Sequence, residues 1–264
     1  MAKISVLIRN RNEADNLRRV LRRLRQQHTQ PSEIIVVDNE SEDESRKYIQ
    51  EFDARLVDLP KSAFTYGKAT NLGFENCSGD LVLMLSSHSL PIGKHFIDDV
   101  CEPFSDSQVA AVRIPIAANS SELRKLDDQL PLDQHSTAEE VFRRGPVASG
   151  CVMLRAAWAE YPINEQLKAA EDKEWALRVL RSGKYIVPVA NAAYCYLRNF
   201  STAAWLNKIR REEAAGLEAA GLVPRASWKD PIATMIAGQR EAFRKFRMEA
   251  ELYAFRSKLR RRRR

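Results

Sequence analysis

Three short polar groups in this sequence each follow a run of apolar residues typical of a buried strand. They are residues 9–13, residues 38–43 and residues 86–89. Apolar strands that alternate with helices indicate a mostly parallel sheet covered on both faces. Ligands of such sheets bind beyond the carboxyl ends of the strands. We therefore expect the three polar groups to lie at the ligand-binding edge of the sheet.

Two segments, residues 38–43 and residues 66–73, suit nucleotide binding, although each has a simpler explanation. The carboxylate of Asp38 can accept hydrogen bonds from a nucleobase or a ribose. Residues 38–43 also suit the cap of the next helix, and the pattern by itself favours the cap. In residues 66–73, YGKATNLG, a glycine precedes a predicted helix and Lys68 lies beside it. A helix N-terminus with a lysine beside it suits the binding of phosphate, but this segment has no P-loop pattern.

A pair of carboxylates opens a predicted helix in residues 170–175, AEDKEW. One of them could act as a general base, with Trp175 one turn further on packing against the face of a sugar. Acids at a helix start also complement the helix dipole, and this structural explanation is favoured when the segment is taken alone.

His88 lies in the polar group LSSHSLP, which ends a strand-like run. Its imidazole could bind a metal, carry a proton or make a structural hydrogen bond. The other histidines are at positions 28, 95 and 135, and none forms a close pair with His88 in the sequence. A strong zinc site at His88 is therefore not predicted.

The periodicity of apolar residues predicts an alternating series of strands and helices. Strands are expected at residues 4–8, 34–37, 55–58, 81–85, 109–114, 147–154 and 184–189. Helices are expected from Asn12 with Leu17, Val20, Leu21 and Leu24 on one face, from Ser41 or Asp43, and at residues 67–77, 96–100, 171–180 and 201–220. Residues 117–145 are polar and weakly periodic, which predicts a long loop with short helical turns.

Composition limits the class of protein. The chain has 264 residues, of which 44% are apolar and 29% charged, and this suits one globular domain or a domain with an appendage. No stretch approaches the roughly 18 apolar residues that span a bilayer. The sequence starts without a signal peptide pattern and its four cysteines form no C-x-x-C pair, so we expect a cytoplasmic protein with reduced thiols.

The positive charge is concentrated in one segment. Residues 240–264 hold eleven Lys and Arg and only three Glu, while the rest of the chain is close to neutral. The body therefore gives no sign of a nucleic-acid surface. A basic amphipathic tail could instead lie on an anionic membrane, or pack on the domain with a solvated end.

Five blocks, in order, resemble glycosyltransferase family 2. They are ISVLIRNRNEADNLRRVL, IIVVDNESEDES, FTYGKATNLGFENCSGDLVLMLSSHSLP, SGCVMLRAAW and AEDKEWALRVLRSG. The resemblance implies an α/β protein of the GT-A fold, with a mostly parallel central sheet flanked by helices. It covers about residues 3–200, so we expect a catalytic domain at residues 1–200 and a helical extension with a basic tail at residues 201–264.

The resemblance also implies roles for individual residues. Asp172 matches the catalytic base of an inverting transfer from a nucleotide-diphospho-sugar to a hydroxyl group. Ser86-Ser87-His88 takes the place of the Asp-x-Asp motif. The nucleotide site would involve Arg9, Asn10, Glu13, Asp38, Lys68, Asn71 and Ser87. The sugar or acceptor side would involve Ser149, Gly150, Glu171 and Trp175.

The metal requirement is left open by this motif. Some GT-A enzymes carry an Asp-Ser-His version in which the histidine binds manganese, and His88 matches that histidine, while Ser86 replaces the aspartate. One imidazole and one hydroxyl hold a divalent ion poorly. The alternatives are therefore Mn²⁺ or Mg²⁺ at His88, or a diphosphate held by Lys68, Arg198 or another cation, with His88 donating a hydrogen bond.

The donor could be a UDP-, GDP- or dTDP-sugar, and the acceptor a glycan or a lipid-linked sugar. A basic tail on the inner membrane face would then bring the enzyme close to a lipid-linked acceptor. The main alternative is a protein that binds nucleotide-sugars with lost or weak activity, since the strand-end carboxylates are missing. A nucleic-acid-binding protein is disfavoured by the neutral body.

Overall fold

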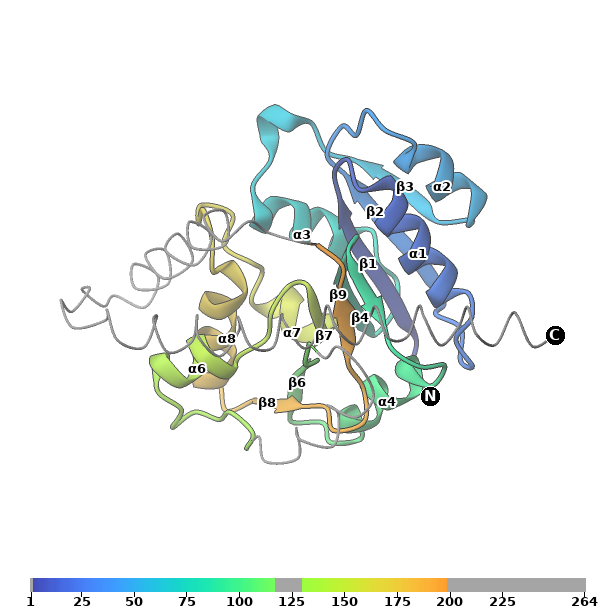
Figure 1. Ribbon diagram of the computed structural model, residues 1–264. Coiled ribbons are helices and arrows are strands. Elements are labelled where there is room, and N and C mark those ends of the chain that lie inside the picture. The colour runs from blue at the N-terminus through green and yellow to red at the C-terminus, as the bar shows by residue number, and fades with distance from the viewer. Residues whose placement is uncertain (1, 117–129, 199–264) are drawn as a thin grey trace, which may run out of the picture. The chain divides into compact units, whose positions relative to one another are not determined.

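A computed structural model describes residues 2–116 and 130–198 (Figure 1). All described residues belong to one compact unit. The predicted C-terminal extension, residues 201–264, lies outside the described residues, as do residues 117–129 of the loop predicted at residues 117–145.

A seven-stranded sheet forms the centre of the described domain. Its order is β3-β2-β1-β4-β7-β6-β8. The strands are β1 (Ile4–Asn10), β2 (Glu33–Asp38), β3 (Arg55–Asp58), β4 (Leu81–Ser86), β6 (Val109–Arg113), β7 (Gly150–Leu154) and β8 (Tyr185–Pro188). Only β7 runs antiparallel to its neighbours, β4 and β6. The seven strands and the mostly parallel sheet predicted from the sequence are confirmed.

The sequence pattern did not predict a second, two-stranded sheet. It consists of β5 (Ser89–Pro91) and β9 (Tyr194–Tyr196), which pair antiparallel. Both strands have only three residues, too few to show a period of two. Their pairing brings the segment after His88 against the segment that follows β8.

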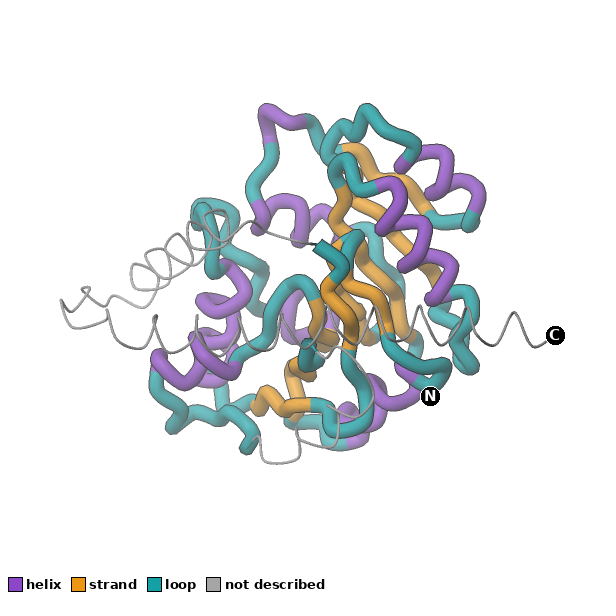
Figure 2. The backbone as a smooth tube through the Cα atoms, in the orientation of Figure 1, coloured by secondary structure: helices purple, strands orange, loops and turns teal. Residues whose placement is uncertain are grey.

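Helices cover both faces of the large sheet (Figures 1 and 2). They are α1 (Ala14–Leu24), α2 (Ser45–Glu51), α3 (Tyr66–Glu75), α4 (Phe96–Cys101), α6 (Ala138–Arg144), α7 (Arg155–Glu160) and α8 (Glu171–Arg181). Residues of α1, α2 and α4 belong to one hydrophobic cluster, and residues of α3, α6, α7 and α8 to the other. Along β1, Val6 and Ile8 belong to the first cluster and Leu7 to the second, as alternation in a strand requires.

Helix α1 confirms its predicted face but not its predicted cap. Its four apolar residues at helical spacing, Leu17, Val20, Leu21 and Leu24, have no exposed surface. The helix begins one residue later than the Asn12 cap requires, because Asn12 has a φ of 51°, in the left-handed region that asparagine tolerates. Asp43 caps it from another segment, accepting a hydrogen bond from the Ala14 N–H at 2.8 Å.

Asp43 therefore joins the starts of two helices. Its other oxygen accepts from the N–H of Ser45, the first residue of α2. Burial opposes ionisation of Asp43, but the hydrogen bonds from Ser45 and Ala14 outweigh it and lower the pKa of the carboxyl. The sequence correctly indicated a capping role for residues 38–43, with the difference that Asp43 serves both helices.

Asn71 of α3 ties down the segment between α7 and α8. Its amide nitrogen donates to the Ile163 carbonyl oxygen at 2.9 Å and to Glu165 Oε1 at 2.8 Å. Its amide oxygen accepts from Trp158 Nε1 and from the Ile163 N–H. At Gly67 the same segment comes so close that a Cβ atom would lie 2.6 Å from the Asn164 carbonyl oxygen. The Asn71 side chain, predicted to belong to the nucleotide site, is thus buried and its polar groups are used in internal hydrogen bonds.

We expect Asn71→Ala to lower the free energy of unfolding by about 2 kcal/mol, because it leaves the buried Ile163 N–H and the partly buried Trp158 Nε1–H without their acceptor. Chemical denaturation measures the change. Gln166→Ala is the matched control, since the Gln166 side chain is exposed in the same segment. Equal stability of the two variants would contradict the proposed tether.

Candidate active site

The carboxyl ends of β2, β1 and β4 lie side by side, as the sequence predicted. In the register of the sheet, Asn10 lies opposite Asp38 and Arg9 lies opposite Ser86. Ser87 and His88 follow directly, and the Ser87 N–H donates to the Arg9 carbonyl oxygen. The polar groups of residues 9–13, 38–43 and 86–89 are thus brought to one edge of the sheet.

Asp38 has no exposed surface at this edge. One of its oxygens accepts from Asn10 Nδ2 at 2.8 Å and from the Ser41 hydroxyl at 2.6 Å. The other accepts from the Ser41 N–H at 2.9 Å and lies 3.3 Å from the Arg46 guanidinium. The carboxylates of Asp38 and Asp43 therefore order the loop after β2, and the predicted contact of Asp38 with a base or ribose has no accessible atom to make it.

Arg9 joins the end of β1 to the start of α8. Its guanidinium lies 3.2 Å from Glu171 Oε1 and donates to the Thr70 hydroxyl at 3.1 Å and to the Tyr66 carbonyl oxygen at 3.3 Å. The Tyr66 ring also lies beneath it, 5.2 Å from the guanidinium carbon. The side chain of Arg9 is 14% exposed and that of Glu171 7%, so this is a largely buried ion pair.

Burial is the main influence on Glu171. Loss of solvent, followed by repulsion from the neighbouring Asp172, raises the pKa of Glu171, while Arg9 opposes the rise. Glu171 thus depends on Arg9 to hold its charge. The sequence analysis placed Arg9 with the nucleotide and Glu171 with the sugar or acceptor, and the structure pairs the two.

The start of α8 is held by two backbone segments. Asp172 accepts from the Ala148 N–H at 2.8 Å through one oxygen and from the Lys173 N–H at 2.8 Å through the other. The Lys173 ammonium donates to the carbonyl oxygens of Gly145 and Pro146 at 2.8 and 2.7 Å. These bonds fix the segment before β7 to the helix and orient the half-buried Asp172 carboxylate.

Ala170, which precedes this pair of acids, has φ 59° and ψ 23°. A left-handed conformation is unfavourable for alanine by roughly 1 kcal/mol. Strain of this kind gathers at functional sites when the surrounding contacts enforce it. Here the bonds of Glu171, Asp172 and Lys173 hold the helix start in place.

Ser149 and Gly150 lie at the same edge, because β7 is antiparallel and Gly150 pairs with Leu85 at the end of β4. The Ser149 hydroxyl lies 3.0 Å from the hydroxyl of buried Tyr194. A Cβ atom on Gly150 would lie 2.0 Å from the Tyr194 ring, so only glycine fits there. Burial raises the pKa of Tyr194, which keeps its hydroxyl protonated.

Trp175 differs from its predicted role. It has no exposed surface and belongs to the hydrophobic cluster that contains α3, α6, α7 and α8. A sugar cannot stack on it in this conformation. Trp175 lies on the buried face of α8, together with Ala176 and Val179, and so packs in the core.

His88 lies in a polar cluster with Glu13, Tyr196 and Arg198. His88 Nε2 lies 2.9 Å from the Tyr196 hydroxyl, and the two rings meet edge to face at 4.6 Å. His88 Nδ1 lies 3.8 Å from Glu13 Oε1. The same carboxylate oxygen lies 3.3 Å from Arg198 Nε. Glu13 thus stands between an imidazole and a guanidinium, beside the end of β4.

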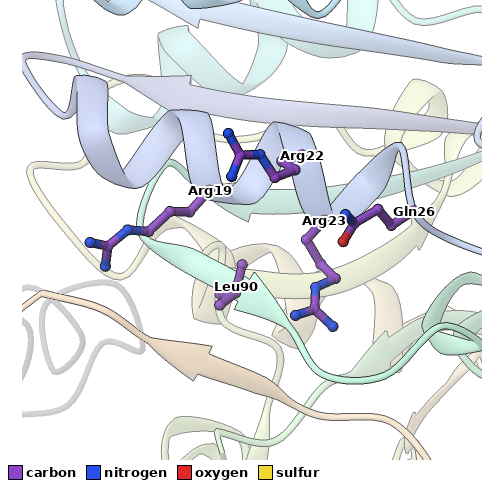
Figure 3. Close-up of a pocket in the computed structure, with 5 residues that line it drawn as sticks. All are labelled: Arg19, Arg22, Arg23, Gln26 and Leu90. Atoms are coloured by element: carbon purple, nitrogen blue, oxygen red, sulfur yellow. The ribbon is translucent and has the colours of Figure 1, made fainter. Parts of the chain in front are cut away.

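Two further basic features lie on the helices α3 and α1. Lys68 belongs to α3, and a separate pocket lies along α1. Lys68 is exposed in the first turn of α3, where Thr65 caps the helix by accepting from the Lys68 N–H. Figure 3 shows a pocket along α1 lined by Arg19, Arg22, Arg23, Gln26 and Leu90. None of the predicted site residues lines this pocket, so it is distinct from the strand-end site.

A family model described as glycosyl transferase family 2 matches residues 5–158, more than half of the chain. This chain belongs to that family. The match includes the ends of β1, β2 and β4, although it stops before α8 and Asp172.

Curated relatives of this family member are distant. The O-antigen chain rhamnosyltransferase WbaN of Salmonella anatum is 22% identical over 189 residues, which is 66% of this chain and 59% of WbaN. The uncharacterized glycosyltransferase alr2836 of a Nostoc species is 32% identical over 114 residues, 42% of this chain and 35% of that protein. The chain thus spans between about a third and three fifths of the length of these relatives.

Solved structures support the fold of the family member. The mannosyltransferase PcManGT of Pyrobaculum calidifontis, in complex with GDP-Man and Mn²⁺, has a TM-score of 0.66 at 15% identity, covering 85% of this chain and 66% of that one. Glucosyl-3-phosphoglycerate synthase of Mycobacterium tuberculosis, in complex with Mn²⁺ and UDP, has a TM-score of 0.60 at 16% identity, with 85% and 82% covered. The GT-A fold predicted from the sequence is confirmed.

Several contacts at the site of this glycosyl transferase family 2 member carried no signal in the sequence, although some of the residues that make them were predicted. Tyr196, the partner of His88, lies 108 positions away, and Glu171 lies 162 positions from Arg9. The Ala148 N–H and the Lys173 ammonium make hydrogen bonds that involve backbone groups, and no residue pattern predicts such bonds. The sequence suggested Arg198 as a cation for the diphosphate, and the structure places its Nε atom 3.3 Å from Glu13 Oε1.

We expect Arg9→Met to lower the free energy of unfolding by about 3 kcal/mol near neutral pH, because it leaves the buried Glu171 carboxylate without its cation. The folded pKa of Glu171 then rises further above the unfolded value of about 4.3. Above the unfolded pKa, Glu171 in the folded variant holds a proton that the unfolded chain has released. The loss of stability therefore grows as the pH rises above the unfolded pKa and shrinks below it. Chemical denaturation at several pH values measures it.

The control for this prediction is Arg11→Met, which removes an exposed arginine two residues away. Adding Glu171→Gln to Arg9→Met removes the unpaired carboxylate charge. The double variant should regain most of the lost stability, and its remaining loss of stability should not depend on pH. A deficit that is the same at all pH values, or that Glu171→Gln does not relieve, would contradict the ion-pair account.

Proposed function

We propose that this chain is an inverting glycosyltransferase that moves a sugar from a nucleotide-diphospho-sugar to a hydroxyl of a glycan or lipid-linked acceptor. The observation that carries the proposal is the Asp172 carboxylate, held by the Ala148 and Lys173 N–H groups at the sheet edge where β1, β2 and β4 end. Membership of glycosyl transferase family 2 supports the donor class.

Asp172 is the proposed general base. Its oxygens each accept one backbone hydrogen bond, which fixes the carboxylate and leaves lone pairs for an acceptor hydroxyl. The base takes the hydroxyl proton as the acceptor oxygen forms a bond to the anomeric carbon. The bond from that carbon to the diphosphate breaks, and the nucleoside diphosphate leaves with the electron pair from the opposite face, which inverts the configuration.

The leaving diphosphate is proposed to bind near His88. Glu13 and His88 bring a carboxylate oxygen and an imidazole nitrogen to 3.8 Å, and both are suitable ligands for Mn²⁺, whereas the Tyr196 hydroxyl already occupies the other imidazole nitrogen. The pair thus fits a divalent ion better than Ser86 and His88 do. Bound Mn²⁺ or Mg²⁺ would neutralise charge on the diphosphate. Without metal, Arg198 and Lys68 are the cations for that charge.

The donor and acceptor classes are proposed by similarity. GDP-Man is bound in PcManGT, and UDP-sugar complexes are known for glucosyl-3-phosphoglycerate synthase and for TarS of Staphylococcus aureus. A UDP-, GDP- or dTDP-sugar therefore remains the proposed donor. The similarity to an O-antigen chain rhamnosyltransferase supports a place in polysaccharide biosynthesis.

Location is also a proposal. No helix in residues 2–116 and 130–198 is long and apolar enough to cross a membrane. We infer a cytoplasmic enzyme that associates with the inner membrane face through its basic tail, residues 240–264, where lipid-linked acceptors would be present. That tail lies outside the described residues.

We expect Asp172→Asn to reduce sugar transfer by at least about a hundredfold, because the amide cannot accept the acceptor proton. Nucleotide binding should persist, since Asn can keep the hydrogen bond from Ala148. Transfer of radiolabelled sugar and thermal stabilisation by nucleotide measure the two properties. Glu174→Gln is the control, because Glu174 lies in the same helical turn but pairs with Arg178. Unchanged transfer in Asp172→Asn would refute its role, and no transfer by the unmodified chain would favour the nucleotide-sugar-binding alternative.

We expect at least one of UDP, GDP and dTDP to raise the melting temperature, because a ligand bound only by the folded state stabilises it. Each nucleotide is measured with and without Mn²⁺. Stabilisation that requires Mn²⁺ and disappears in Glu13→Gln and His88→Ala supports the metal-bound diphosphate. Equal stabilisation without metal assigns the diphosphate to Arg198 and Lys68. If none of the three nucleotides stabilises the chain, the proposed donor site is refuted.

A further inference from the structure

A second cluster of metal-binding side chains lies away from the candidate active site. It consists of His28, His95 and Asp98, whose ligand atoms all lie within 4.8 Å of one another. The two Nδ1 atoms lie 3.6 and 3.5 Å from the same oxygen, Asp98 Oδ2. Within residues 2–116 and 130–198, this is the only group of three or more such side chains.

The cluster is separated from the active site by the length of α1. Glu13 of the His88 cluster directly precedes α1, and His28 follows the end of the helix. An 11-residue helix spans about 16 Å. The histidine pair therefore belongs to the amino-terminal edge of the parallel strands, opposite the edge where Asp38, Ser87 and Asp172 lie.

Three contacts join the two segments that carry the ligands. The His28 N–H donates to the Lys94 carbonyl oxygen at 2.7 Å, and the buried Gln27 amide donates to the Gly93 carbonyl oxygen at 3.0 Å. The Thr29 hydroxyl donates to Asp98 Oδ1. The last bond leaves Oδ2 directed to both histidines, as a second-shell partner orients a metal ligand.

Hydrogen bonding does not account for this arrangement. Separations of 3.5 and 3.6 Å exceed those of ordinary hydrogen bonds. Asp98 Oδ2 is buried and has no partner at an ordinary hydrogen-bond distance in the described part of the chain. The two imidazole rings lie only 5.0 Å apart, at an angle of 40°. Two nitrogen atoms thus converge on one oxygen without bonding to it.

A bound metal ion does account for it. Ligands about 2.0 to 2.1 Å from tetrahedral zinc lie roughly 3.4 Å from one another, close to the two observed N···O separations, and the two imidazole ligand atoms lie within 4.8 Å of each other. His95 directly precedes α4 and Asp98 lies in its first turn, three residues further on, while His28 comes from the loop before β2. The imidazoles are 69% and 67% exposed, which leaves room for water as a fourth ligand.

We propose that His28, His95 and Asp98 bind Zn²⁺ or a divalent ion of similar preference and thereby fasten the loop after α1 to α4. Two imidazoles and one carboxylate favour Zn²⁺ over Mg²⁺, which prefers oxygen ligands. The site is structural and does not depend on the proposed transferase activity. No nucleotide is needed to complete it.

The test is calorimetric titration of Zn²⁺ into tag-free, EDTA-treated protein in the absence of nucleotide, with Co²⁺ absorption spectra to report the coordination geometry. We expect one strong site per chain with a tetrahedral Co²⁺ spectrum, and a rise in melting temperature on zinc binding. His28→Ala and His95→Ala should weaken binding at least about a hundredfold, and Thr29→Val about tenfold.

His135→Ala is the matched control and should bind Zn²⁺ as the unmodified chain does, whereas His88→Ala tests whether the strong zinc site lies at the proposed active site instead. Circular dichroism checks that each variant is folded. Because His28 and His95 are exposed, we expect their replacement to leave the fold intact. The proposal is overturned if the unmodified chain binds no zinc, if His28→Ala binds it equally well, or if His88→Ala is the variant that loses it.

Discussion

The buried ion pair between Arg9 and Glu171 connects the two parts of the sheet edge where the candidate active site lies. Arg9 ends the first strand of the domain, and Glu171 opens the last described helix, so the contact spans 162 positions. A buried carboxylate is unfavourable unless a cation and hydrogen bonds compensate its lost hydration. The start of α8 is therefore placed against β1 and α3, whose Thr70 and Tyr66 share the guanidinium. Asp172 takes its position from this contact.

The same helix start shows how backbone groups complete a site. Lys173 turns into the protein and binds the carbonyl oxygens of Gly145 and Pro146, and this holds the approach to β7. The Ala148 N–H can then reach the Asp172 carboxylate. The left-handed conformation of Ala170 is tolerated because these contacts together outweigh its modest cost. A carboxylate held in this way needs little reorganisation before it accepts a proton, as the proposed role of Asp172 requires.

The His88 cluster follows from the small sheet of β5 and β9. Pairing of these strands brings Tyr196 to His88 and places Arg198 near Glu13. The protein thus has a carboxylate between an imidazole and a guanidinium beside the end of β4. Such a cluster can accept a diphosphate either through its cations or through a metal held by Glu13 and His88. The choice depends on how strongly Arg198 competes for the Glu13 carboxylate.

Local patterns in the sequence were sufficient for the fold and for part of the site. The apolar runs predicted all seven strands of the large sheet, the spacing of Leu17 to Leu24 predicted the buried face of α1, and strand ends located Arg9, Asp38 and His88. These features depend on periodicities of two and 3.6 residues, which a sequence displays directly. The five family blocks added the GT-A fold and the role expected of Asp172.

Only the tertiary structure decided which polar groups remain available to a ligand. Asp38 and Asn71 use their side chains internally, Trp175 belongs to the core, and Arg9 pairs with Glu171. Whether a polar side chain faces a partner or a ligand depends on residues far away in the chain that packing brings near. The sequence by itself therefore determined the elements and their order, while long-range packing decided the burial, the partners and the charge of the groups at their ends.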